Sequence, residues 1–463
     1  MSAPTPPTSP RSSDRLLIWA IVASQFGPPF MFSGVAVALP AMGHELDLSA
    51  VQLGLVETTF LASATAFLLP AGRLADAGDR RTVFRWSLIL FGVLTLALAL
   101  ANGAVSVLGL RLLQGMASAL GSAAGPALLV ELVPPERRGR IFGAVLGTAY
   151  AGLSAGPLAA GWIVAHLGWR AVFAFGAALI LVGYLPVHFR LRSRWRNPGR
   201  WVHVPSLLLL VTAVFAMVFS SAALQRGWPA WAGLGGGALL LVVFLWLQLR
   251  IRSPLLDLRE LARNAVMTRA LVVQLLVYGN AYCSIFMMSI FLQVTKGMAA
   301  PDAGLILAIG SLVMACIAPF AGRLADAMRP QVVAAVGVGA VAVSSVLGMS
   351  LTADVPTWRV AAVLVAQGIG FGLFSSPNLA LIMGSMRGEH SGTASALAAQ
   401  SRGVGMFAGM AMTGVLIAVH FGSQQVRDDP PRFVLALGNA YTVLLVTSGL
   451  ALLFAVVGRR RAA

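Results

Sequence analysis

Long uninterrupted apolar stretches are the feature that most constrains how this chain folds. A helix that crosses about 30 Å of hydrocarbon needs roughly 20 mainly apolar residues. We count fourteen such stretches among the 463 residues. They lie near residues 14–40, 51–71, 84–101, 106–131, 141–165, 171–190, 204–222, 230–250, 268–293, 302–321, 331–351, 358–384, 392–419 and 434–457. The sequence therefore predicts an all-α, polytopic membrane protein with fourteen transmembrane helices.

Composition agrees with a chain that uses lipid as its solvent. Hydrophobic residues make up 58% of the chain and charged residues 11%, whereas soluble domains are nearer 45–50% apolar and about 25% charged. We find no nucleotide-binding loop, metal-ligand cluster or catalytic triad in the sequence, and no extramembrane segment long enough for an ATPase domain. We therefore expect neither an enzyme nor a bound cofactor. We expect a multi-pass protein of the cell inner membrane that is a monomer in the lipid bilayer.

The distribution of basic residues predicts the topology. The net charge is +17, and 25 of the 33 Lys and Arg residues fall on one side if the fourteen spans alternate. Cytoplasmic loops of membrane proteins carry such an excess of basic residues. The charge is therefore a topology signal that places both termini in the cytoplasm, and it does not indicate nucleic-acid binding.

An internal repeat divides the chain. The segment 72–76 (GRLAD) recurs at 322–326, an offset of 250, and glycines of the segment 152–161 recur in 405–414 at an offset of 253. Both GRLAD copies end an outward-to-inward helix, so the halves have the same orientation, as in parallel transporter repeats. The predicted organisation is a disordered tail (1–13), a six-helix bundle (14–190), a linker with two inserted helices (191–267), a second six-helix bundle (268–457) and a basic tail (458–463).

Four motifs carry a resemblance to a known family. They are GRLADAGDRR at 72–81, Arg111-Leu-Leu-Gln114-Gly115, the glycines around Pro157 in 152–161, and AVALP at 36–40. In this order they resemble the major facilitator superfamily, specifically its fourteen-helix drug:proton antiporters. The resemblance implies two six-helix bundles that rock about a central site. It also implies proton-coupled export of hydrophobic or amphipathic small molecules by alternating access, with protons and a small-molecule substrate as partners.

The GRLAD segment is interpreted as a conformational latch. Its glycine lets helix ends approach closely, and its Asp can favour the positive N-terminus of a neighbouring helix. Arg80 and Arg81, which follow the segment, can pair with acids at other cytoplasmic helix ends, and Glu131 is the natural candidate. The resemblance implies a latch between bundles that stabilises the outward-open state; ordinary positive-inside charge at a turn is the alternative. Ala77 and Asp79 depart from the family pattern. The latch residues are Gly72, Asp76, Arg80, Arg81, Glu131 and, in the second copy, Asp326.

The segment 152–161 combines small residues with a proline. Small residues four apart let helix backbones touch, and proline removes a backbone hydrogen bond and bends the helix. The resemblance associates this pattern with antiport, whereas helix packing alone is the alternative. The residues concerned are Gly152, Gly156, Pro157 and Gly161.

Three charged residues lie well inside predicted spans: Glu57, Arg111 and Arg402. An ionisable side chain in hydrocarbon costs at least about 2.5–3.5 kcal/mol, so each needs a physical reason. At 1.5 Å per residue, Glu57 and Arg111 share a depth of roughly 7–9 Å below the outer ends of their helices. Their repeat counterparts are Leu307 and Leu364, so the shared bundle architecture does not require these charges. Arg402 lies nearer the inner half, where it can snorkel or hold a carbonyl.

The predicted proton-coupling site consists of Glu57, as a candidate proton carrier, and of Arg111 with Gln114 one turn on, which resemble the family motif linked to proton transfer. Burial favours the protonated form of a carboxyl group and a nearby cation favours its ionised form, which is what coupling requires. The alternatives are a static pair, or Glu57 meeting water in an outer vestibule. Met31 stands where many members of the family carry an Asp, and Ala36 replaces a frequently polar residue. This departure weakens the inference of cation export more than the inference of fold.

The resemblance also implies that polar residues of the second half line a central substrate cavity. Uncharged amides and phenols beside methionine and phenylalanine suit a bulky apolar or amphipathic ligand; helix–helix hydrogen bonding is the alternative. The two cysteines, Cys283 and Cys316, are expected to be packed core thiols. The predicted cavity residues are Gln274, Tyr278, Asn280, Tyr282, Gln367 and Asn378.

Two other functions remain open from the sequence. One is a facilitator or symporter of another organic solute, anionic if Arg111 contacts it. The other is a sensor or scaffold that retains the transporter fold.

Overall fold

The computed structural model describes residues 12–77, 79–133, 135–190, 203–224, 227–251, 254–256, 258–385, 391–422 and 424–457. Over these ranges the chain is built from long helices and contains no strand. Thirteen helical segments of the described chain are long and apolar enough to cross a membrane. The 33-residue α6 (Pro135–Leu167), packed against α2 and α12, makes the fourteenth. The predicted all-α, multi-pass membrane fold is confirmed.

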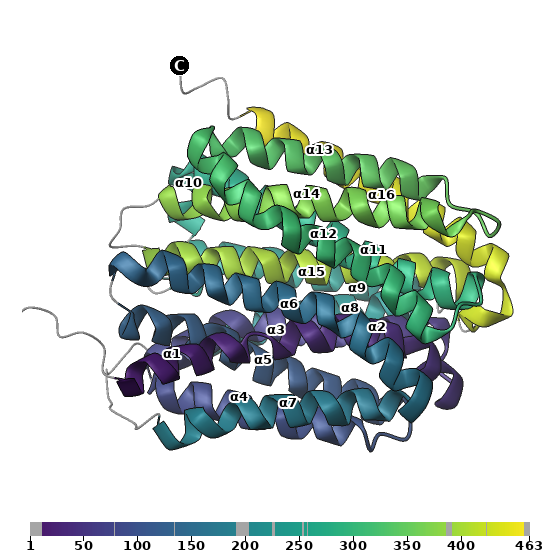
Figure 1. Cartoon of the computed structure of the whole chain (residues 1–463), viewed down its shortest axis with the longest axis horizontal. Coiled ribbons are helices and arrows are strands. Elements are labelled where there is room, and N and C mark those ends of the chain that lie inside the picture. The colour runs from purple at the N-terminus through teal and green to yellow at the C-terminus, as the bar shows by residue number, and fades with distance from the viewer. Residues whose placement is uncertain are drawn as a thin grey trace, which may run out of the picture.

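The helices form two bundles, one above the other in Figure 1, and an inserted pair. The first bundle contains α1 (Ser12–Ser24), α2 (Gly27–Glu45), α3 (Ala50–Ala77), α4 (Arg80–Leu98), α5 (Ala104–Leu132), α6 and α7 (Trp169–Arg190). The second contains α11 (Ala265–Ile290), which continues as the π-helical turn η2 (Phe291–Thr295), α12 (Ala300–Ala327), α13 (Pro330–Met349), α14 (Thr357–Gly384), α15 (Ser391–Phe421) and α16 (Pro430–Val457). The insert contains α8 (Val204–Ala222) and α9 (Trp228–Arg250), followed by the short α10 (Leu258–Arg263).

The repeat is visible in helix boundaries and in helix packing. Both α3 and α12 have 28 residues, and both of their ends are offset by 250. Helix α3 packs on α5 as α12 packs on α14, and α2 packs on α6 as α11 packs on α15. The bundles meet along two seams, α6 with α12 and α3 with α15. In the repeat, α3 corresponds to α12 and α6 corresponds to α15, so the two seams are equivalent to each other. The parallel repeat therefore extends to the bundle interface.

Glycines permit the closest of these approaches. A Cβ atom on Gly409 would lie 2.2 Å from the carbonyl oxygen of Gly279, where α15 meets α11. A Cβ atom on Gly304 would lie 2.3 Å from the carbonyl oxygen of Pro157, at the α6–α12 seam. Small residues at such positions bring helix backbones into direct contact, which is the main source of helix association in lipid.

The first predicted span is not one continuous helix. The structure divides it into α1 and α2, with a break at Gln25 and Phe26. Pro28 and Pro29, at the start of α2, have no N–H to donate to the preceding turn, so an α-helix cannot run through this point with its hydrogen bonds intact. The predicted span near 14–40 is present as Leu16–Glu45, and the Gly27-Pro28-Pro29 sequence is the signal for the break within it.

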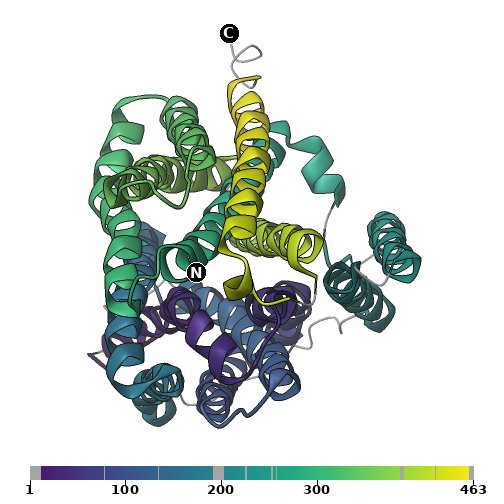
Figure 2. The same ribbon diagram turned by 90° about the vertical axis from the view of Figure 1, so that its right-hand side faces the viewer.

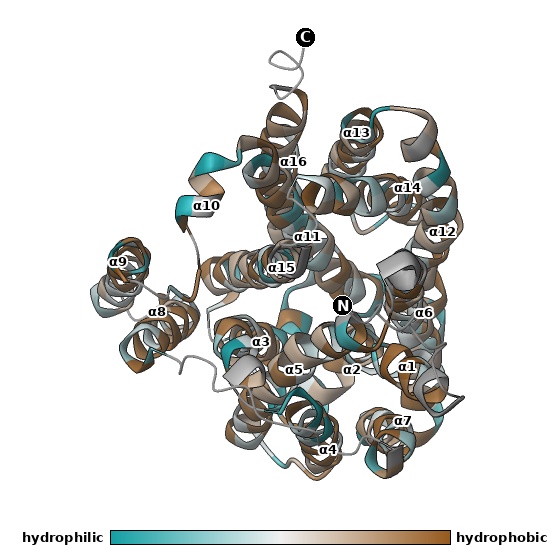
Figure 3. Ribbon diagram, turned by 90° about the vertical axis from the view of Figure 1, so that its left-hand side faces the viewer, coloured by the Kyte–Doolittle hydropathy of each residue, from teal (hydrophilic) through white to brown (hydrophobic). Residues whose placement is uncertain are grey.

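The inserted pair lies on one side of the molecule. Figures 2 and 3 show α8 and α9 beside the bundles, on the side away from the α6–α12 seam. Helix α8 contacts both α3 and α15, and Val214 of α8 belongs to the same buried cluster as Ala62 and Ala66 of α3. The insert therefore covers the α3–α15 seam.

The two cysteines differ in exposure. Cys283 is buried, as expected, whereas Cys316 is exposed. Cys316 lies on α12 between Leu312 and Phe320, which are 49% and 63% exposed. Residues four apart share one face of a helix, and this face of α12 is turned away from the bundle. The expectation of a packed core thiol at Cys316 was wrong, because an apolar span in lipid has apolar residues on its outer face as well.

Candidate functional site

A cavity of about 220 Å³ lies between the two bundles. The first bundle contributes residues from the α1–α2 break, α2, α3, α5 and α6, and the second contributes residues from α11, α14 and α15. The aromatic and polar residues around it include Gln25, Phe32, Phe60, Ser118 and Tyr150 on one side and Tyr278, Tyr282, Phe371 and Arg402 on the other.

Aromatic rings from both bundles meet at this cavity. The ring centroids of Phe32 and Tyr282 are 4.1 Å apart, and those of Tyr278 and Phe371 are 4.8 Å apart. The structure thus brings Tyr278 and Tyr282 to the cavity wall, where the sequence placed them. It adds Arg402, which carries the one charge among the residues that line this cavity. Such a wall suits a ligand with a flat apolar body.

Other predicted cavity residues join helices to one another. Gln274 donates to the carbonyl oxygen of Ala398 (2.6 Å). Asn378 donates to that of Ala270 (3.1 Å), and Asn280 donates to that of Leu444 (3.0 Å). Gln367 donates to the carbonyl oxygen of Ala281 (3.5 Å) and accepts a hydrogen bond from Ser284 (2.8 Å). It also lines a smaller pocket of about 40 Å³ that shares Tyr282 with the main cavity. The bonds from these amides to backbone carbonyls fit the alternative of helix–helix hydrogen bonding.

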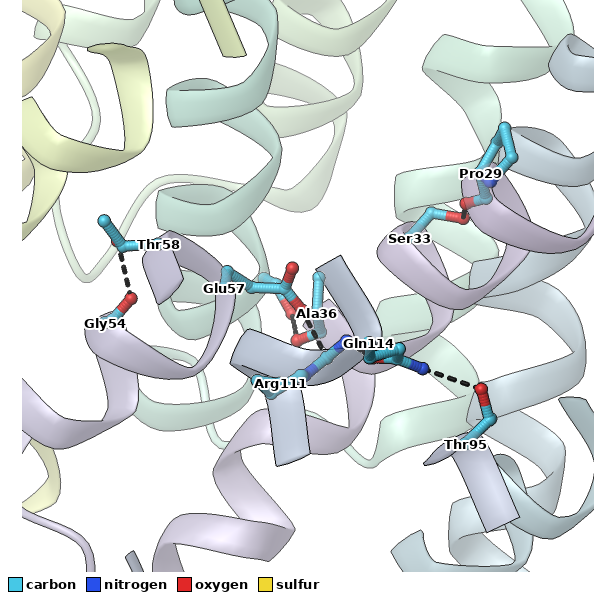
Figure 4. Close-up of polar contacts among 10 residues, drawn as sticks. Pro29, Ser33, Ala36, Gly54, Glu57, Thr58, Thr95, Arg111 and Gln114 are labelled. Atoms are coloured by element: carbon cyan, nitrogen blue, oxygen red, sulfur yellow. Dashed lines mark hydrogen bonds and ion pairs between the residues drawn. The ribbon is translucent and has the colours of Figure 1, made fainter. Parts of the chain in front are cut away.

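Glu57 and Arg111 form a buried ion pair between α3 and α5. Arg111 Nη2 donates to Glu57 Oε1 (2.9 Å) and Nη1 donates to Gln114 Oε1 (2.9 Å). Gln114 Nε2 in turn donates to Thr95 Oγ1 (2.7 Å), as Figure 4 shows. Both charged side chains are 0% exposed. The matched depth seen in the sequence thus becomes a contact, and the alternative in which Glu57 meets water in a vestibule is not what this conformation shows.

This pair is incompletely satisfied and lies next to the cavity. Among the described residues, Glu57 Oε2 and Arg111 Nε have no hydrogen-bond partner. The guanidinium carbon lies 5.4 Å from the ring centroid of Phe60, which lines the cavity. A buried ion pair is held firmly only when its remaining lone pairs and protons are also bonded. The pair is therefore less firmly held than a fully bonded one, and a change in it would reach the cavity through Phe60.

Hydrogen bonds between the bundles close the end of the molecule opposite the GRLAD segments, which we call the distal end. Ser289 Oγ donates to the carbonyl oxygen of Ala36 (2.6 Å), and Gln293 Nε2 donates to that of Val37 (3.1 Å). Pro40 lies inside α2 and has no N–H for the carbonyl four residues earlier, that of Ala36. Ser289 supplies this missing donor. We call these four residues, Ala36, Val37, Ser289 and Gln293, the distal clamp.

The distal clamp gives the AVALP motif a physical role that the sequence alone did not reveal. Proline within a helix was the available signal, but only the packing of α11 against α2 identifies the donor. A backbone contact reinforces the closure, since the amide of Ala50 donates to the carbonyl of Gln424 (3.0 Å). The cavity lies on the GRLAD side of these contacts.

At the GRLAD end the predicted Arg81–Glu131 pair is present. Arg81 Nη2 lies 3.2 Å from Glu131 Oε1, and the pair joins α4 to α5 within the first bundle. Asp79, which departs from the family pattern, accepts from the amide of Arg81 (3.1 Å) and from Thr82 Oγ1 (2.8 Å). It is the N-cap of α4, a role in which Asp is favoured.

Other latch residues are placed only in part. Gly72 lies in the last turns of α3, and no described atom outside its own helix lies within 4 Å of the Cβ position there. Arg80 begins α4. The side chains of Asp76 and Asp326 lie outside the described part of the structure, although their backbones belong to the ends of α3 and α12. The latch between bundles stays a prediction.

The glycines of α6 pack in two directions. Cβ atoms would lie 2.4 Å from the carbonyl oxygen of Phe26 at Gly152 and 2.7 Å from that of Phe30 at Gly156, both inside the first bundle. A Cβ atom at Gly161 would lie 2.7 Å from the carbonyl oxygen of Ala300, across the α6–α12 seam. Helix packing explains the first two glycines, and the third lies where the bundles must move past each other if they rock.

Comparison with known proteins gives consistent matches along nearly the whole chain. A family model described as Major Facilitator Superfamily matches residues 21–410 and 270–461. A riboflavin transporter of Clostridioides difficile (strain 630) is 23% identical over 412 residues, which cover 88% of this chain and 89% of that protein. A puromycin resistance protein of Streptomyces alboniger is 29% identical, covering 90% and 86%. A tetracenomycin C resistance and export protein of Streptomyces glaucescens is 27% identical, covering 84% and 73%.

Proposed function

This chain belongs to the major facilitator superfamily, and we propose that it is a proton-coupled exporter of hydrophobic or amphipathic small molecules that works by alternating access. The observation that carries the proposal is the buried Glu57–Arg111 pair beside a cavity shared by both bundles. Resistance and export proteins among its relatives support the direction of transport. The aromatic cavity wall supports the class of substrate.

The geometry supports alternating access with the distal end outside the cell. The proposed orientation, which follows the basic residues, places the GRLAD end in the cytoplasm of an inner-membrane protein. The distal clamp then closes the outer side, and the cavity lies on the inner side of that closure. Substrate enters the cavity from the cytoplasm in this conformation and leaves after the clamp opens.

The chemistry of the buried pair supports the proposed proton coupling. Ionised Glu57 holds Arg111, whereas protonated Glu57 loses the ionic attraction and leaves Arg111 to Gln114 and to neighbouring rings. The next residue, Thr58, donates to the carbonyl of Met410 (3.4 Å) across the α3–α15 seam. A change at Glu57 is therefore one residue from the bundle interface and one helical turn from the cavity residue Phe60.

Proton flux linked to substrate tests the proposal. Purified protein is reconstituted in liposomes with an acidic lumen that contains the pH dye pyranine, in a neutral bath. Riboflavin, puromycin and tetracenomycin C, the compounds named by the relatives, are then added outside together with a panel of other amphipathic compounds. We expect some of these to bind in a thermal-shift assay and to speed alkalinisation of the lumen. If compounds bind and exchange across the membrane without moving protons, the protein is a facilitator and the proposal of antiport is wrong.

Removing the distal clamp should shift the protein toward the outward-open conformation. Each clamp bond contributes about 1 kcal/mol, so Ser289→Ala with Gln293→Ala, which removes both bonds, should change the ratio of open to closed protein by roughly 30-fold. Spin labels at Asn102 and Asp354, exposed in distal loops of the two bundles, report the opening by electron–electron double resonance in a Cys316→Ser background.

The matched control is Ser350→Ala. Its exposed hydroxyl donates to the carbonyl of Leu347 within its own helical region, so its loss should leave the distance distribution unchanged. An unchanged distribution in the clamp variant as well would show that these bonds do not determine the closed state.

A further inference from the structure

Arg402 is a cavity residue that the proton-coupling mechanism does not use. It lies on the face of α15 that also presents Ala399, Gly403 and Met406 to the cavity. Its guanidinium carbon lies 6.0 Å from the ring centroid of Tyr278, and its side chain is half-buried. Among the described residues, the one charge on the cavity wall therefore belongs to an arginine on the second bundle.

No carboxylate of the described residues forms an ion pair with Arg402. The sequence has 16 acidic residues, and the acid that lies deep within a described spanning helix is Glu57. Glu57 is already bonded to Arg111. Arg111 shows what a buried arginine in this protein normally obtains, namely a carboxylate, an amide oxygen and two aromatic rings. Arg402 has an aromatic ring but lacks the carboxylate.

First-bundle residues do not supply the missing anion. Met31, at the position where the family resemblance would allow an acid, is directed toward α7, because a Cβ atom on Gly176 would lie 2.0 Å from its sulfur. The first bundle instead presents Phe32, Phe60 and the hydroxyl of Tyr150, which is buried without a hydrogen-bond partner among the described residues. The cavity therefore contains a cation, aromatic faces and an unsatisfied hydroxyl.

We propose that the cavity selects amphipathic aromatic anions, with a carboxylate or similar group of the substrate bound by Arg402 and its rings held between Phe32–Tyr282 and Tyr278–Phe371. The inference rests on the proposed function, because it names the substrate class of the same cavity. A charged residue within the membrane is retained at a cost and commonly marks a substrate pathway. The planar guanidinium matches a carboxylate through two parallel N–H donors. The same charge repels a cationic ligand.

Three naphthyl compounds that differ in charge test the proposal: 2-naphthoate, 2-naphthamide and 2-naphthylmethylammonium. Binding to the full-length protein in nanodiscs of zwitterionic lipid is measured by calorimetry. We expect the wild type to bind the anion about tenfold more tightly than the amide, and the cation more weakly than either. Arg402→Gln should abolish the preference for the anion and leave binding of the amide unchanged, while Arg402→Lys should keep part of the preference.

Arg269→Gln is the matched control, because Arg269 of α11 lines a separate pocket of about 60 Å³, so the variant removes the same charge elsewhere and should not alter the order of the three ligands. A preference for the amide or the cation in wild type, or an anion preference that survives in Arg402→Gln, would overturn the inference while leaving export intact. Failure of all three compounds to bind would count against the cavity as a site for aromatic substrates, and hence against the proposed function itself.

A lipid headgroup is the other source of an anion. Nanodiscs that contain phosphatidylglycerol separate the two sources. If Arg402 serves a small-molecule acid, anionic lipid should leave the affinity for 2-naphthoate unchanged. Competition by the lipid that disappears in Arg402→Gln would assign the arginine to lipid and overturn the proposal.

Discussion

Replacement of Glu57 by glutamine is expected to abolish the proton dependence of transport while exchange of substrate continues. Glutamine has the shape of glutamate, and its Oε1 can still accept from Arg111 Nη2, the bond that is 2.9 Å long in the native pair. It cannot bind or release a proton at the pH of the cell. The variant should therefore still fold and still bind substrate, yet show no coupling between the pH gradient and substrate movement.

Two assays on the same proteoliposomes separate these effects. Substrate-dependent alkalinisation of the lumen should fall to the level of protein-free liposomes, whereas counterflow of labelled substrate without a pH gradient should persist. Glu131→Gln is the matched control, since Glu131 is an exposed acid paired with Arg81 at a helix end, and it should retain proton coupling. Unchanged pH dependence in Glu57→Gln would remove Glu57 from the mechanism.

Replacement of Arg111 by leucine is expected to destabilise the folded protein by about 3–5 kcal/mol, because it leaves the carboxylate of Glu57 buried without its partner. Replacing both residues by leucine removes both buried charges and should restore most of the lost stability. Apolar substitutes for a whole buried ion pair are often neutral or stabilising. The free energy of unfolding in mixed micelles is measured for the wild type, for Arg111→Leu and for the double leucine variant.

The exposed pair at the GRLAD end provides the comparison. Side chains of Arg81 and Glu131 are 17% and 46% exposed, and water-accessible pairs contribute about 0–1 kcal/mol. Arg81→Leu should therefore change stability far less than Arg111→Leu. A double leucine variant that is as unstable as Arg111→Leu alone would show that the arginine acts through its packing on Phe60 and Phe173, and that the charge pair is not the source of the loss.

The sequence predicted those features that depend on length, period and depth. Span length set the number of membrane helices, and the offset of 250 residues set which helices correspond, down to the matching ends of α3 and α12. Depth along the helix predicted that Glu57 and Arg111 could meet, because the 1.5 Å rise per residue is fixed. The same reasoning placed Tyr278 and Tyr282 on one face of their helix.

Only the tertiary structure decided which face of each helix packs inside a bundle and which face points outward. In water, a polar residue marks the outer face of a helix, but in lipid the outer face and the packed face are both apolar. Cys316 and Cys283 therefore look alike in sequence, although one faces outward and the other inward. Likewise an amide such as Asn280 can serve a neighbouring helix or a ligand, and only the carbonyl of Leu444 at 3.0 Å shows which.

The distal clamp and the position of Arg402 illustrate the same limit. In the sequence, Pro40 indicated that a carbonyl oxygen on the preceding turn would lack its N–H donor. Arg402 indicated a charge within a membrane span, which requires a physical reason. The donor, Ser289 of α11, lies about 250 residues from Ala36 in the sequence. The cavity beside Arg402 is lined largely by residues of the opposite bundle. Local chemistry thus determined which groups needed partners, and the packing of the two bundles decided which partners they obtained.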